Sequence, residues 1–455
     1  MPQPESDDAQ ALQRVKAHTP AGTTLVVCGG MYTCRTWEGA KAKLQHYRRR
    51  QPEETPLYRI VYHGRDELPR IWEERFQQTY GVLRDEVLET FDEYLNCGLL
   101  QHGAARVYCD TCKHSLLVAF SCKKRGVCPS CNAKRAVKFG EHLCDSVLER
   151  VPHRHCGFTL PKRLRVFFRY DRELNTILFQ AAAEALRAVL GTDSRTPALV
   201  LTLQTAGEAL NFNPHLHGLL ADGTFDAAGN FAPFPAIDTE RMAEHFRDRV
   251  LSELVTRGLI TDEVPAQILS QEHSGFGAWV GEPFEEADRT RFVARYIERG
   301  PLSLEKLSIT DDIVAYTTSD GVTQEFDALE FLALLSCHIP KPYESVTRYY
   351  GWYSCRRRGE RAKHAPVPDE SATQEHRTEP SVSWAACMKR VFEIDPLECP
   401  RCKSQMRIVA FLTNEREILK IADALRIPHA QAPPKIPRPP QLEYFNHFPP
   451  DDFSA

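Results

Sequence analysis

The stretch Asn213-Pro214-His215-Leu216-His217-Gly218-Leu219-Leu220 is the segment from which the rest of the chain can be interpreted. Side chains two positions apart in a β-strand lie on one face, so His215 and His217 would direct two imidazoles to the same point. The apolar residues around them are typical of a buried strand, and Asp222-Gly223 predicts a hairpin turn into the segment 223–231. The alternative is a pair of hydrogen-bonded structural histidines. The pattern favours a divalent-metal site on a strand.

A second segment, Arg291 to Ser303, predicts an amphipathic helix. Phe292 and Tyr296 are four residues apart and therefore share a helix face, and Gly300-Pro301 predicts the end of the helix. The structural alternative is that Tyr296 only packs on Phe292. A tyrosine on a helix beside a histidine-bound cation is nevertheless the arrangement required for metal-assisted attack on a phosphodiester.

The chain contains fifteen cysteines, several of them in close pairs. A chain expected in the reducing cytosol does not build a disulfide framework, so paired cysteines indicate metal. Two Cys-x2-Cys pairs separated by roughly 15 residues have the spacing of a zinc ribbon. The sequence therefore predicts one structural Zn²⁺ held by Cys109, Cys112, Cys128 and Cys131.

Other cysteines and one histidine near these pairs are weaker candidates. Cys97, His114 and Cys122 are interpreted as core or surface residues that bind no metal. A further pair, Cys399 and Cys402, supplies only half of a zinc site, so a second zinc and a metal-free turn are equally consistent with it.

The overall charge does not indicate a nucleic-acid ligand, because the formal net charge is -4. No apolar run approaches the ~18 residues of a membrane helix, and the polar N-terminus lacks a signal peptide. We therefore expect a cytoplasmic protein without a membrane partner. Basic residues are nevertheless concentrated locally among aromatics, a composition that suits single-stranded DNA. The candidate DNA contacts are Lys162, Arg163, Arg165, Arg169 and Arg348.

A chain of 455 residues is long enough for several domains. Apolar periodicity predicts helices before the cysteine pairs, and strands alternating with helices after them, which favours an α+β fold. The expected division is a peripheral segment 1–55, a helical and zinc-ribbon domain 56–150, a catalytic domain 151–345, a basic segment and linker 346–380, and a C-terminal module with a Pro-rich tail 381–455.

The chain also resembles the HUH endonuclease superfamily, in particular the rolling-circle transposases of bacterial insertion sequences. The resemblance rests on the motif at 213–217, on Arg295-Tyr296-Ile297, and on several blocks in the same order along the chain. These blocks are Ser121-Cys122-Lys123, Cys128-Pro129-Ser130-Cys131, Leu160-Pro161-Lys162-Arg163-Leu164-Arg165, Arg348-Tyr349-Tyr350-Gly351-Trp352-Tyr353-Ser354 and Asp395-Pro396-Leu397-Glu398-Cys399-Pro400-Arg401-Cys402.

The resemblance implies an antiparallel palm covered by helices and a nucleophilic Tyr296 that forms a 5'-phosphotyrosine. Some members of the family carry two tyrosines four residues apart, but Phe292 occupies the other position here, which implies the single-tyrosine branch. Tyr349 and Tyr350 are rival tyrosines that we interpret as packing or DNA-facing residues. The catalytic cation would be Mg²⁺ or Mn²⁺, and a hard cation needs an oxygen ligand besides two histidines. Gln204 is the candidate third ligand, with Glu208 as its rival.

These observations predict a transposase that nicks and rejoins single-stranded DNA or the hairpin ends of a mobile element. A homodimer and an association with the bacterial nucleoid are compatible with this function. A plasmid replication initiator or relaxase would use the same chemistry, and a zinc-ribbon DNA-binding regulator would explain the cysteines but not the histidine motif. A histidine-triad hydrolase would need a histidine where Leu219 stands, and an amidohydrolase would need a strand–helix barrel that the pattern does not show.

Overall fold

The computed structural model describes residues 45–46, 51–190, 195–234, 236–271, 273–310, 313–364, 394–395 and 397–427. Most of the predicted peripheral segment, the end of the predicted linker and the Pro-rich tail lie outside these residues. The described part is α+β, with antiparallel sheets covered by helices, as the sequence predicted. None of its helices combines the length and the apolar character required to cross a membrane.

The largest sheet, here called the palm, has the strand order β12-β5-β6-β4-β8, with the short β7 paired to β6. All of its pairings are antiparallel. Its strands are β4 (His153–Thr159), β5 (Thr196–Ala206), β6 (Phe212–Phe225), β7 (Phe231–Pro233), β8 (Gly277–Val280) and β12 (Thr347–Gly351). Since β12 belongs to this sheet, the predicted domain limit at 345 cuts through the palm and is wrong.

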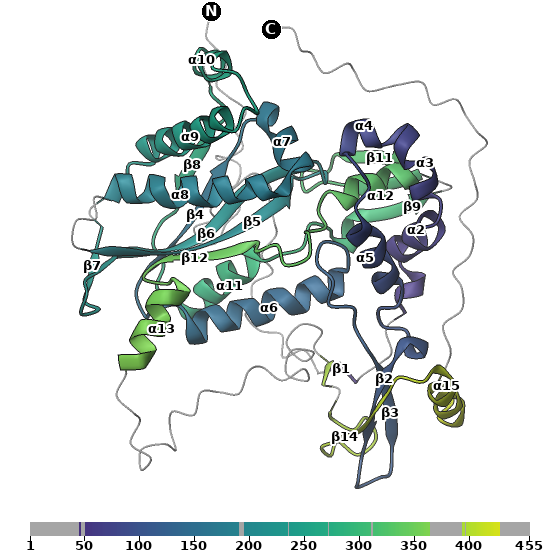
Figure 1. Cartoon of the computed structure of the whole chain (residues 1–455). Helices are drawn as coiled ribbons and strands as arrows, with labels where there is room; N and C mark the ends of the chain where they lie inside the picture. Colours follow the sequence, from purple (N-terminus) through teal and green to yellow (C-terminus); the bar gives the residue numbers. More distant parts are fainter. Residues whose placement is uncertain are drawn as a thin grey trace, which may run out of the picture. The chain divides into compact units, whose positions relative to one another are not determined.

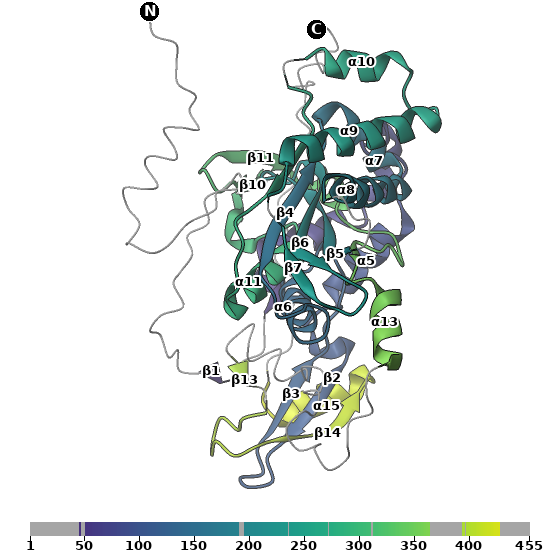
Figure 2. The ribbon, with the colours of Figure 1, turned by 90° about the vertical axis from the view of Figure 1, so that its left-hand side faces the viewer.

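Helices cover both faces of the palm, which explains why β5 is apolar almost without interruption. Leu199, Leu201 and Leu203 point into the larger core, beneath the helices α8 (Asn175–Leu190) and α9 (Thr239–Thr256). Val200 and its neighbours point to the opposite face, against α6 (Pro129–Ser146) and α11 (Ala287–Ile297). Figures 1 and 2 show these two layers of helices on either side of the sheet.

The predicted turn at Asp222-Gly223 does not form, because β6 continues through it to Phe225. The Asp222 backbone N–H donates to the Pro152 carbonyl, and a Cβ on Gly223 would lie 2.2 Å from the Ala232 carbonyl oxygen, so this position requires glycine. The hairpin turns instead at 226–230, where the Asp226 carboxylate accepts two backbone N–H bonds, each 2.9 Å long. The hairpin was predicted, but its turn is a few residues later.

A second core joins the N-terminal helices to a segment from the middle of the chain. The helices are α2 (Pro56–Gly64), α3 (Leu68–Arg75), α4 (Gln77–Tyr80) and α5 (Asp85–Leu95). They pack with β9 (Leu307–Thr310), β10 (Ile313–Thr317), β11 (Thr323–Asp327) and α12 (Ala328–Ser336). Residues 302–339 therefore contribute to the helical core, and not to the palm as the predicted domain 151–345 required.

The remaining described elements are short connectors and a small sheet. They include α7 (Arg165–Tyr170), α10 (Glu263–Leu269), α13 (Cys355–His364), α15 (Glu415–Ala424), and the two-residue strands β1 (Gln45–His46) and β13 (Ile394–Asp395). The small sheet has the order β14-β2-β3, with β2 (Ala104–Tyr108), β3 (Ser115–Ala119) and β14 (Arg407–Leu412). The C-terminal strand thus completes a sheet of the N-terminal region, so the described part of the predicted module 381–455 does not stand alone.

His338 connects the helical core to the palm and gives the fold a predictable pH dependence. Its Nε2 donates to the Leu210 carbonyl (2.7 Å), and its Nδ1 lies 3.0 Å from the Thr205 hydroxyl. Burial lowers the pKa of His338 to about 4 from an ordinary 6.5. Only the unfolded chain gains this proton between those values, so stability is full above pH 6.5 and decreases as the pH falls toward 4.

We expect this one histidine to contribute about 2 kcal/mol to the loss of unfolding free energy between pH 8 and pH 5. Chemical denaturation of wild type and His338→Gln at both pH values measures it, and the variant should lose less stability on acidification. His102→Gln replaces an exposed histidine and is the matched control. Equal acid sensitivity of wild type and His338→Gln would show that His338 does not titrate on unfolding.

Candidate active site and cysteine clusters

The two predicted histidines lie side by side on the palm face that α11 covers. In the sheet register, His217 of β6 pairs with Gly157 of β4, and Leu219 pairs with His155, so His155 points to the same face. The ring centroids of His215 and His217 are 4.9 Å apart, and those of His155 and His217 are 5.2 Å apart. The structure therefore adds a third histidine that the sequence analysis did not single out.

Hydrogen bonds and burial leave these imidazoles suited to bind a cation. His215 Nδ1 donates to the Asn213 carbonyl (2.7 Å), which leaves the lone pair on Nε2. His217 Nδ1 and His155 Nε2 share a 3.2 Å hydrogen bond. Burial lowers the pKa of His155 and of His215 to about 4, and it lowers the pKa of His217 well below its ordinary value. All three rings are therefore neutral at pH 7 and keep a lone pair.

Tyr296 lies in the last turn of α11, with its ring against the rings of His155 and His217. Its ring centroid is 5.5 Å from that of His217 and 5.6 Å from that of His155, both edge to face. The Arg299 guanidinium carbon is 4.5 Å from the centre of the Tyr296 ring. A guanidinium at this distance over an aromatic ring is a cation–π contact, and it places a positive charge beside the Tyr296 ring.

The helix carrying Tyr296 ends where the sequence predicted, but the placement of Phe292 differs. It ends at Ile297, just before Gly300-Pro301, and Gly300 also allows a close approach to Asn132 of α6. Phe292 does not face the sheet, because 60% of its surface is exposed. Tyr296 contacts the rings of His155 and His217, so it does not pack only on Phe292.

Two polar side chains hold the end of α11 against the sheet. Gln204 Nε2 donates to the carbonyls of Tyr296 and Ile297, at 3.2 Å each, so its amide oxygen is the end of the side chain that can face a cation. Gln204 pairs directly with His215 across β5 and β6. Glu298 accepts a 2.6 Å hydrogen bond from Arg135 of α6 and one from Thr347 of β12. These contacts fix the position of the Tyr296 backbone.

An indole forms one wall of the site. Trp279 of the edge strand β8 pairs with Gly157, and its ring centroid is 4.7 Å from that of His155. A Cβ on residue 157 would lie 2.5 Å from the Trp279 Nε1 atom, so the indole occupies the space that a side chain at 157 would fill. Neither Trp279 nor His155 was singled out from the sequence, although His153-Arg154-His155 repeats the histidine alternation of β6.

The rival tyrosines are placed differently from Tyr296. Tyr349 of β12 is half-buried, with the Arg358 guanidinium 5.1 Å from its ring, and Tyr350 packs into the opposite core. Burial raises the pKa of both hydroxyls, which makes each a poorer nucleophile. This placement agrees with their interpretation as packing residues.

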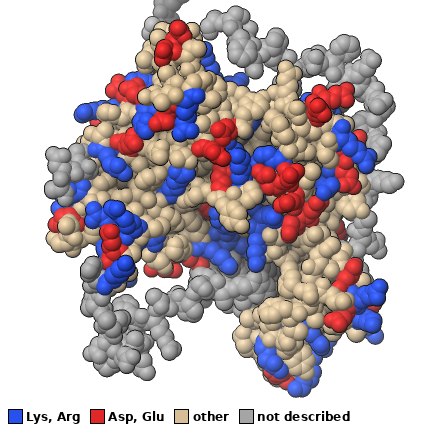
Figure 3. Space-filling model, in the orientation of Figure 1, with Lys and Arg blue, Asp and Glu red and all other residues tan. Residues whose placement is uncertain are grey.

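The predicted basic residues belong to two parts of the fold. Lys162, Arg163, Arg165 and Arg169 occupy the short helices after β4, and the positive charge of Arg165 contributes to the low pKa of His215. Arg348 of β12 lies on the palm face opposite the histidines, donating to the Thr176 hydroxyl (2.9 Å) with its guanidinium over Phe179. Arg348 is therefore removed from the set of candidate DNA contacts near the histidines. Figure 3 shows Lys and Arg gathered near the centre of one face, in the region where Figure 1 draws β12 and α6.

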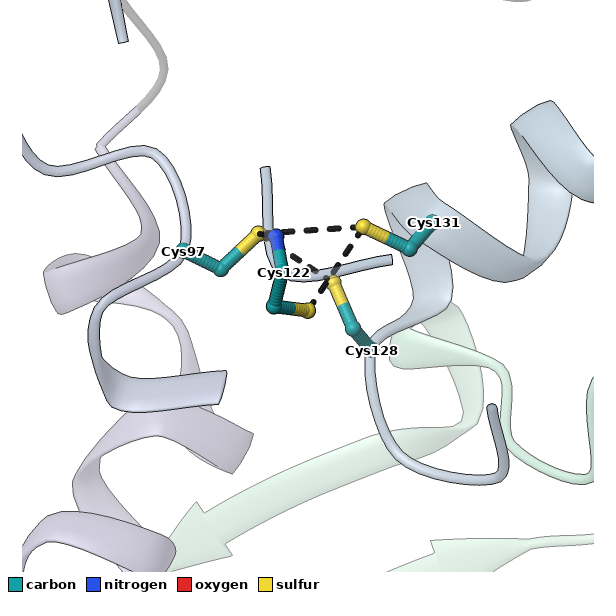
Figure 4. A group of neighbouring side chains, drawn as sticks. All are labelled: Cys97, Cys122, Cys128 and Cys131. Atoms are coloured by element: carbon teal, nitrogen blue, oxygen red, sulfur yellow. Dashed lines mark hydrogen bonds between the residues drawn. The ribbon is translucent and has the colours of Figure 1, made fainter. Parts of the chain in front are cut away.

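The cysteines form two clusters, neither of which is the predicted set. In the first cluster, Cys128 and Cys131 at the start of α6 meet Cys97 and Cys122, with Sγ–Sγ distances of 3.6 to 3.8 Å (Figure 4). Four sulfurs bonded to one Zn²⁺ at 2.3 Å would be about 3.8 Å apart. The single site Cys109, Cys112, Cys128 and Cys131 is therefore wrong, as is the interpretation of Cys97 and Cys122 as ordinary core residues.

In the second cluster, Cys109 and Cys112 meet Cys399 and Cys402. The shortest Sγ–Sγ distances are 3.4 Å, between Cys112 and Cys399, and 3.5 Å, between Cys109 and Cys402. The two predicted Cys-x2-Cys pairs of the N-terminal region thus belong to different clusters.

Comparisons with known proteins agree with this geometry. The family model described as "Transposase zinc-binding domain" matches residues 68–160, and the one described as "Putative transposase" matches residues 199–361. The chain is 26% identical over 358 residues to the transposase for insertion sequence element IS801 of Pseudomonas savastanoi pv. phaseolicola, covering 73% of this chain and 86% of the relative. The chain belongs to the IS91-type insertion-sequence transposases.

A second relative of this transposase is "Putative transposase y4qJ" of Sinorhizobium fredii (strain NBRC 101917 / NGR234), 30% identical over 125 residues, or 27% of this chain and 31% of that protein. No solved structure matches the chain significantly. The zinc-binding match contains all of the first cysteine cluster but only Cys109 and Cys112 of the second. As a transposase, the protein is a DNA endonuclease and strand transferase.

Proposed function

We propose that this transposase nicks and rejoins single-stranded DNA through a 5'-phosphotyrosine on Tyr296. The observation that supports the proposal most strongly is the Tyr296 ring 5.5 Å from His217, at the end of a helix anchored by Gln204 and Glu298. The proposal favours a transposase over a zinc-ribbon regulator, because a regulator would leave the paired histidines and the anchored tyrosine without a use.

The residues around Tyr296 fit a hard divalent cation such as Mg²⁺ or Mn²⁺. His215 Nε2, His217 Nε2 and the Gln204 amide oxygen would hold it, since the hydrogen bonds of these side chains leave those atoms as acceptors. A cation bound there polarises a phosphate and neutralises charge that develops on it. In this arrangement His217 Nδ1 donates to His155 Nε2, so His155 orients His217.

Tyr296 would supply the covalent step. Its hydroxyl oxygen attacks the scissile phosphorus, and the bond from phosphorus to the 3'-oxygen breaks. The phenolic proton passes to solvent and the departing oxygen takes up a proton, which leaves a free 3'-OH and a 5'-phosphotyrosine. Arg299 stabilises the attacking phenolate. Because the new bond is again a phosphodiester, rejoining needs no external energy source.

The substrate strand would reach the site along the basic residues after β4. Lys162 and Arg163 are exposed, and Arg169 lies over the rings of Tyr80 and Tyr170, so cations and aromatic rings alternate there. Such a surface binds the backbone by charge and the bases by stacking. We propose that the strand is single-stranded DNA or an unpaired region of the hairpin ends of the mobile element.

We expect cleavage of a labelled single-stranded oligonucleotide in Mg²⁺ or Mn²⁺ and little cleavage of the same sequence as a linear duplex. The reason is that the histidines lie on a sheet face under α11, where a duplex cannot place a bare phosphate. Binding to the single strand should also weaken steadily as salt increases, because phosphate contacts release counterions. Gel-based cleavage and binding assays at several salt concentrations measure both effects. Preferential cutting of the duplex would contradict the proposal.

A further inference from the structure

The second cysteine cluster brings together residues from distant parts of the chain. Cys112 and Cys399 are 287 positions apart, and Cys109 and Cys402 are 293 positions apart, yet their sulfurs are 3.4 and 3.5 Å from each other. All four sulfurs lie within 4.8 Å of one another. This is the spacing of four thiolates around one Zn²⁺, whose sulfur ligands are about 3.8 Å apart.

The two halves of this cluster have the same backbone conformation. In the N-terminal half, the Cys109 N–H donates to the His114 carbonyl, and the Lys113 N–H donates to the Cys109 carbonyl. In the C-terminal half, the Cys399 N–H donates to the Ser404 carbonyl, and the Lys403 N–H donates to the Cys399 carbonyl. Lys113 and Lys403 both adopt left-handed φ values, 62° and 64°. Two matching Cys-x2-Cys turns facing each other form a zinc ribbon.

The strained conformation of these turns needs a compensating interaction. A positive φ is unfavourable for a non-glycine residue, and here it occurs at the matching position of both halves. The cluster also has little apolar core to stabilise it, since its buried residues besides cysteines are Val107, Val118 and Met406. Small cysteine-rich modules with so little core fold around their metal.

The C-terminal half is held in register with the N-terminal half by a shared sheet. β14 pairs with β2 along its length, from Arg407 opposite Tyr108 to Leu412 opposite Ala104. Arg407 also makes an exposed ion pair with Asp110, between the two N-terminal cysteines. The cysteines are therefore aligned by backbone pairing that extends well beyond them.

We propose that Cys109, Cys112, Cys399 and Cys402 form a second tetrathiolate Zn²⁺ site that fastens the C-terminal segment 397–427 to the hairpin β2–β3. Binding releases the thiol protons and leaves four thiolates on the metal, a soft ligand set that selects Zn²⁺ over Mg²⁺. The metal closes a ring of chain that contains the whole palm. This site is independent of the Tyr296 chemistry, and its failure would leave the proposed cleavage reaction untouched.

Metal content tests the number and composition of the sites. We expect two zinc ions per chain in the full-length protein by native mass spectrometry, and one in the double variant Cys399→Ser/Cys402→Ser. Cys144→Ser/Cys355→Ser removes two cysteines outside both clusters and is the matched control, which should retain two ions. Two zinc ions in Cys399→Ser/Cys402→Ser would overturn the proposal.

A second readout remains valid if that double variant folds poorly. In Cys402→His, the site keeps a metal ligand, so cobalt substituted for zinc should show reduced sulfur-to-metal absorption at one of two sites. A full-length chain with a protease sequence inserted at residue 380 should keep its C-terminal fragment attached after cleavage and release it on chelation. A fragment that dissociates while both zinc ions remain bound would contradict the proposed second zinc site. An unchanged cobalt spectrum in Cys402→His would contradict it as well.

Discussion

Tyr296→Phe is expected to abolish the covalent protein–DNA adduct, reducing its yield by more than roughly a thousandfold, the scale seen when a nucleophile is removed. The substitution deletes only the hydroxyl, while the ring that contacts His155, His217 and Arg299 remains. The fold and DNA affinity should therefore be unchanged. Incubation with an end-labelled single strand and Mg²⁺, followed by denaturing electrophoresis, measures the adduct.

The neighbouring tyrosines supply the controls for this experiment. Tyr349→Phe and Tyr350→Phe should both retain adduct formation, because the two hydroxyls are half-buried and burial raises their pKa. Tyr350 also lies on the sheet face opposite the histidines. An adduct that persists in Tyr296→Phe and disappears in Tyr349→Phe or Tyr350→Phe would reverse the assignment.

Loss of metal from the first cysteine cluster is expected to unfold the surrounding region. Structural Zn²⁺ in small sites contributes an apparent 10–16 kcal/mol, which is comparable to the whole stability of a domain. Cys131→Ser should therefore lose one zinc ion and lower the unfolding temperature by well over 10 °C. A loss of about 1 kcal/mol in unfolding free energy already lowers the unfolding temperature of a domain by several degrees. Thermal unfolding followed by circular dichroism, together with metal analysis, measures both.

The same variant should also impair DNA cleavage, through α6. Cys128 and Cys131 fix the start of α6, and this helix packs so closely on α11 that a Cβ on Gly140 would lie 2.8 Å from the Arg295 side chain. Cys144→Ser, on the same helix but outside the cluster, is the matched control and should behave like wild type. A Cys131→Ser protein with the zinc content and stability of wild type would contradict the assignment of Cys131 as a ligand of a structural zinc ion.

The palm was largely predictable because its signals are local. The apolar residues around His215 and His217 indicated β6, and the amphipathic pattern from Arg291 onward indicated the helix that is α11. His215 and His217 share a face for the same reason. The turn after β6 was misplaced because Asp222-Gly223 has turn chemistry, whereas in the fold Gly223 is needed for close contact with Ala232.

The zinc ligands were not predictable from spacing alone. Cys128 and Cys131 lie roughly 15 residues after Cys109 and Cys112, which is the usual spacing of the two cysteine pairs in a zinc ribbon. The spacing therefore indicated that these two pairs share one zinc ion. Their partners in the fold are Cys399 and Cys402, nearly 290 positions away, which only the pairing of β14 with β2 brings close. The same long-range pairing explains why the expected C-terminal module is part of an N-terminal sheet.

Some site residues carried signals that were weaker or ambiguous. His155 belongs to a second histidine alternation, His153-Arg154-His155. His153 hydrogen-bonds to the buried Tyr353 hydroxyl, so only His155 of this motif lies at the candidate active site. Arg348 was selected for its charge, yet a one-residue shift along β12 decides which face it occupies. Trp279 has no distinguishing pattern, because its role depends on Gly157 in the adjacent strand.

Mass spectrometry of the trapped adduct tests the central claim most directly. The wild-type protein is first allowed to react with a single-stranded oligonucleotide. Digestion with nuclease and trypsin would then leave a nucleotide, attached through its 5'-phosphate, on one peptide. Cleavage after Arg295 and Arg299 isolates Tyr296 in the peptide 296–299, whereas Tyr349 and Tyr350 fall together in the peptide 349–356. Our account predicts the added mass on 296–299. The added mass on 349–356, or on any peptide without Tyr296, would contradict it.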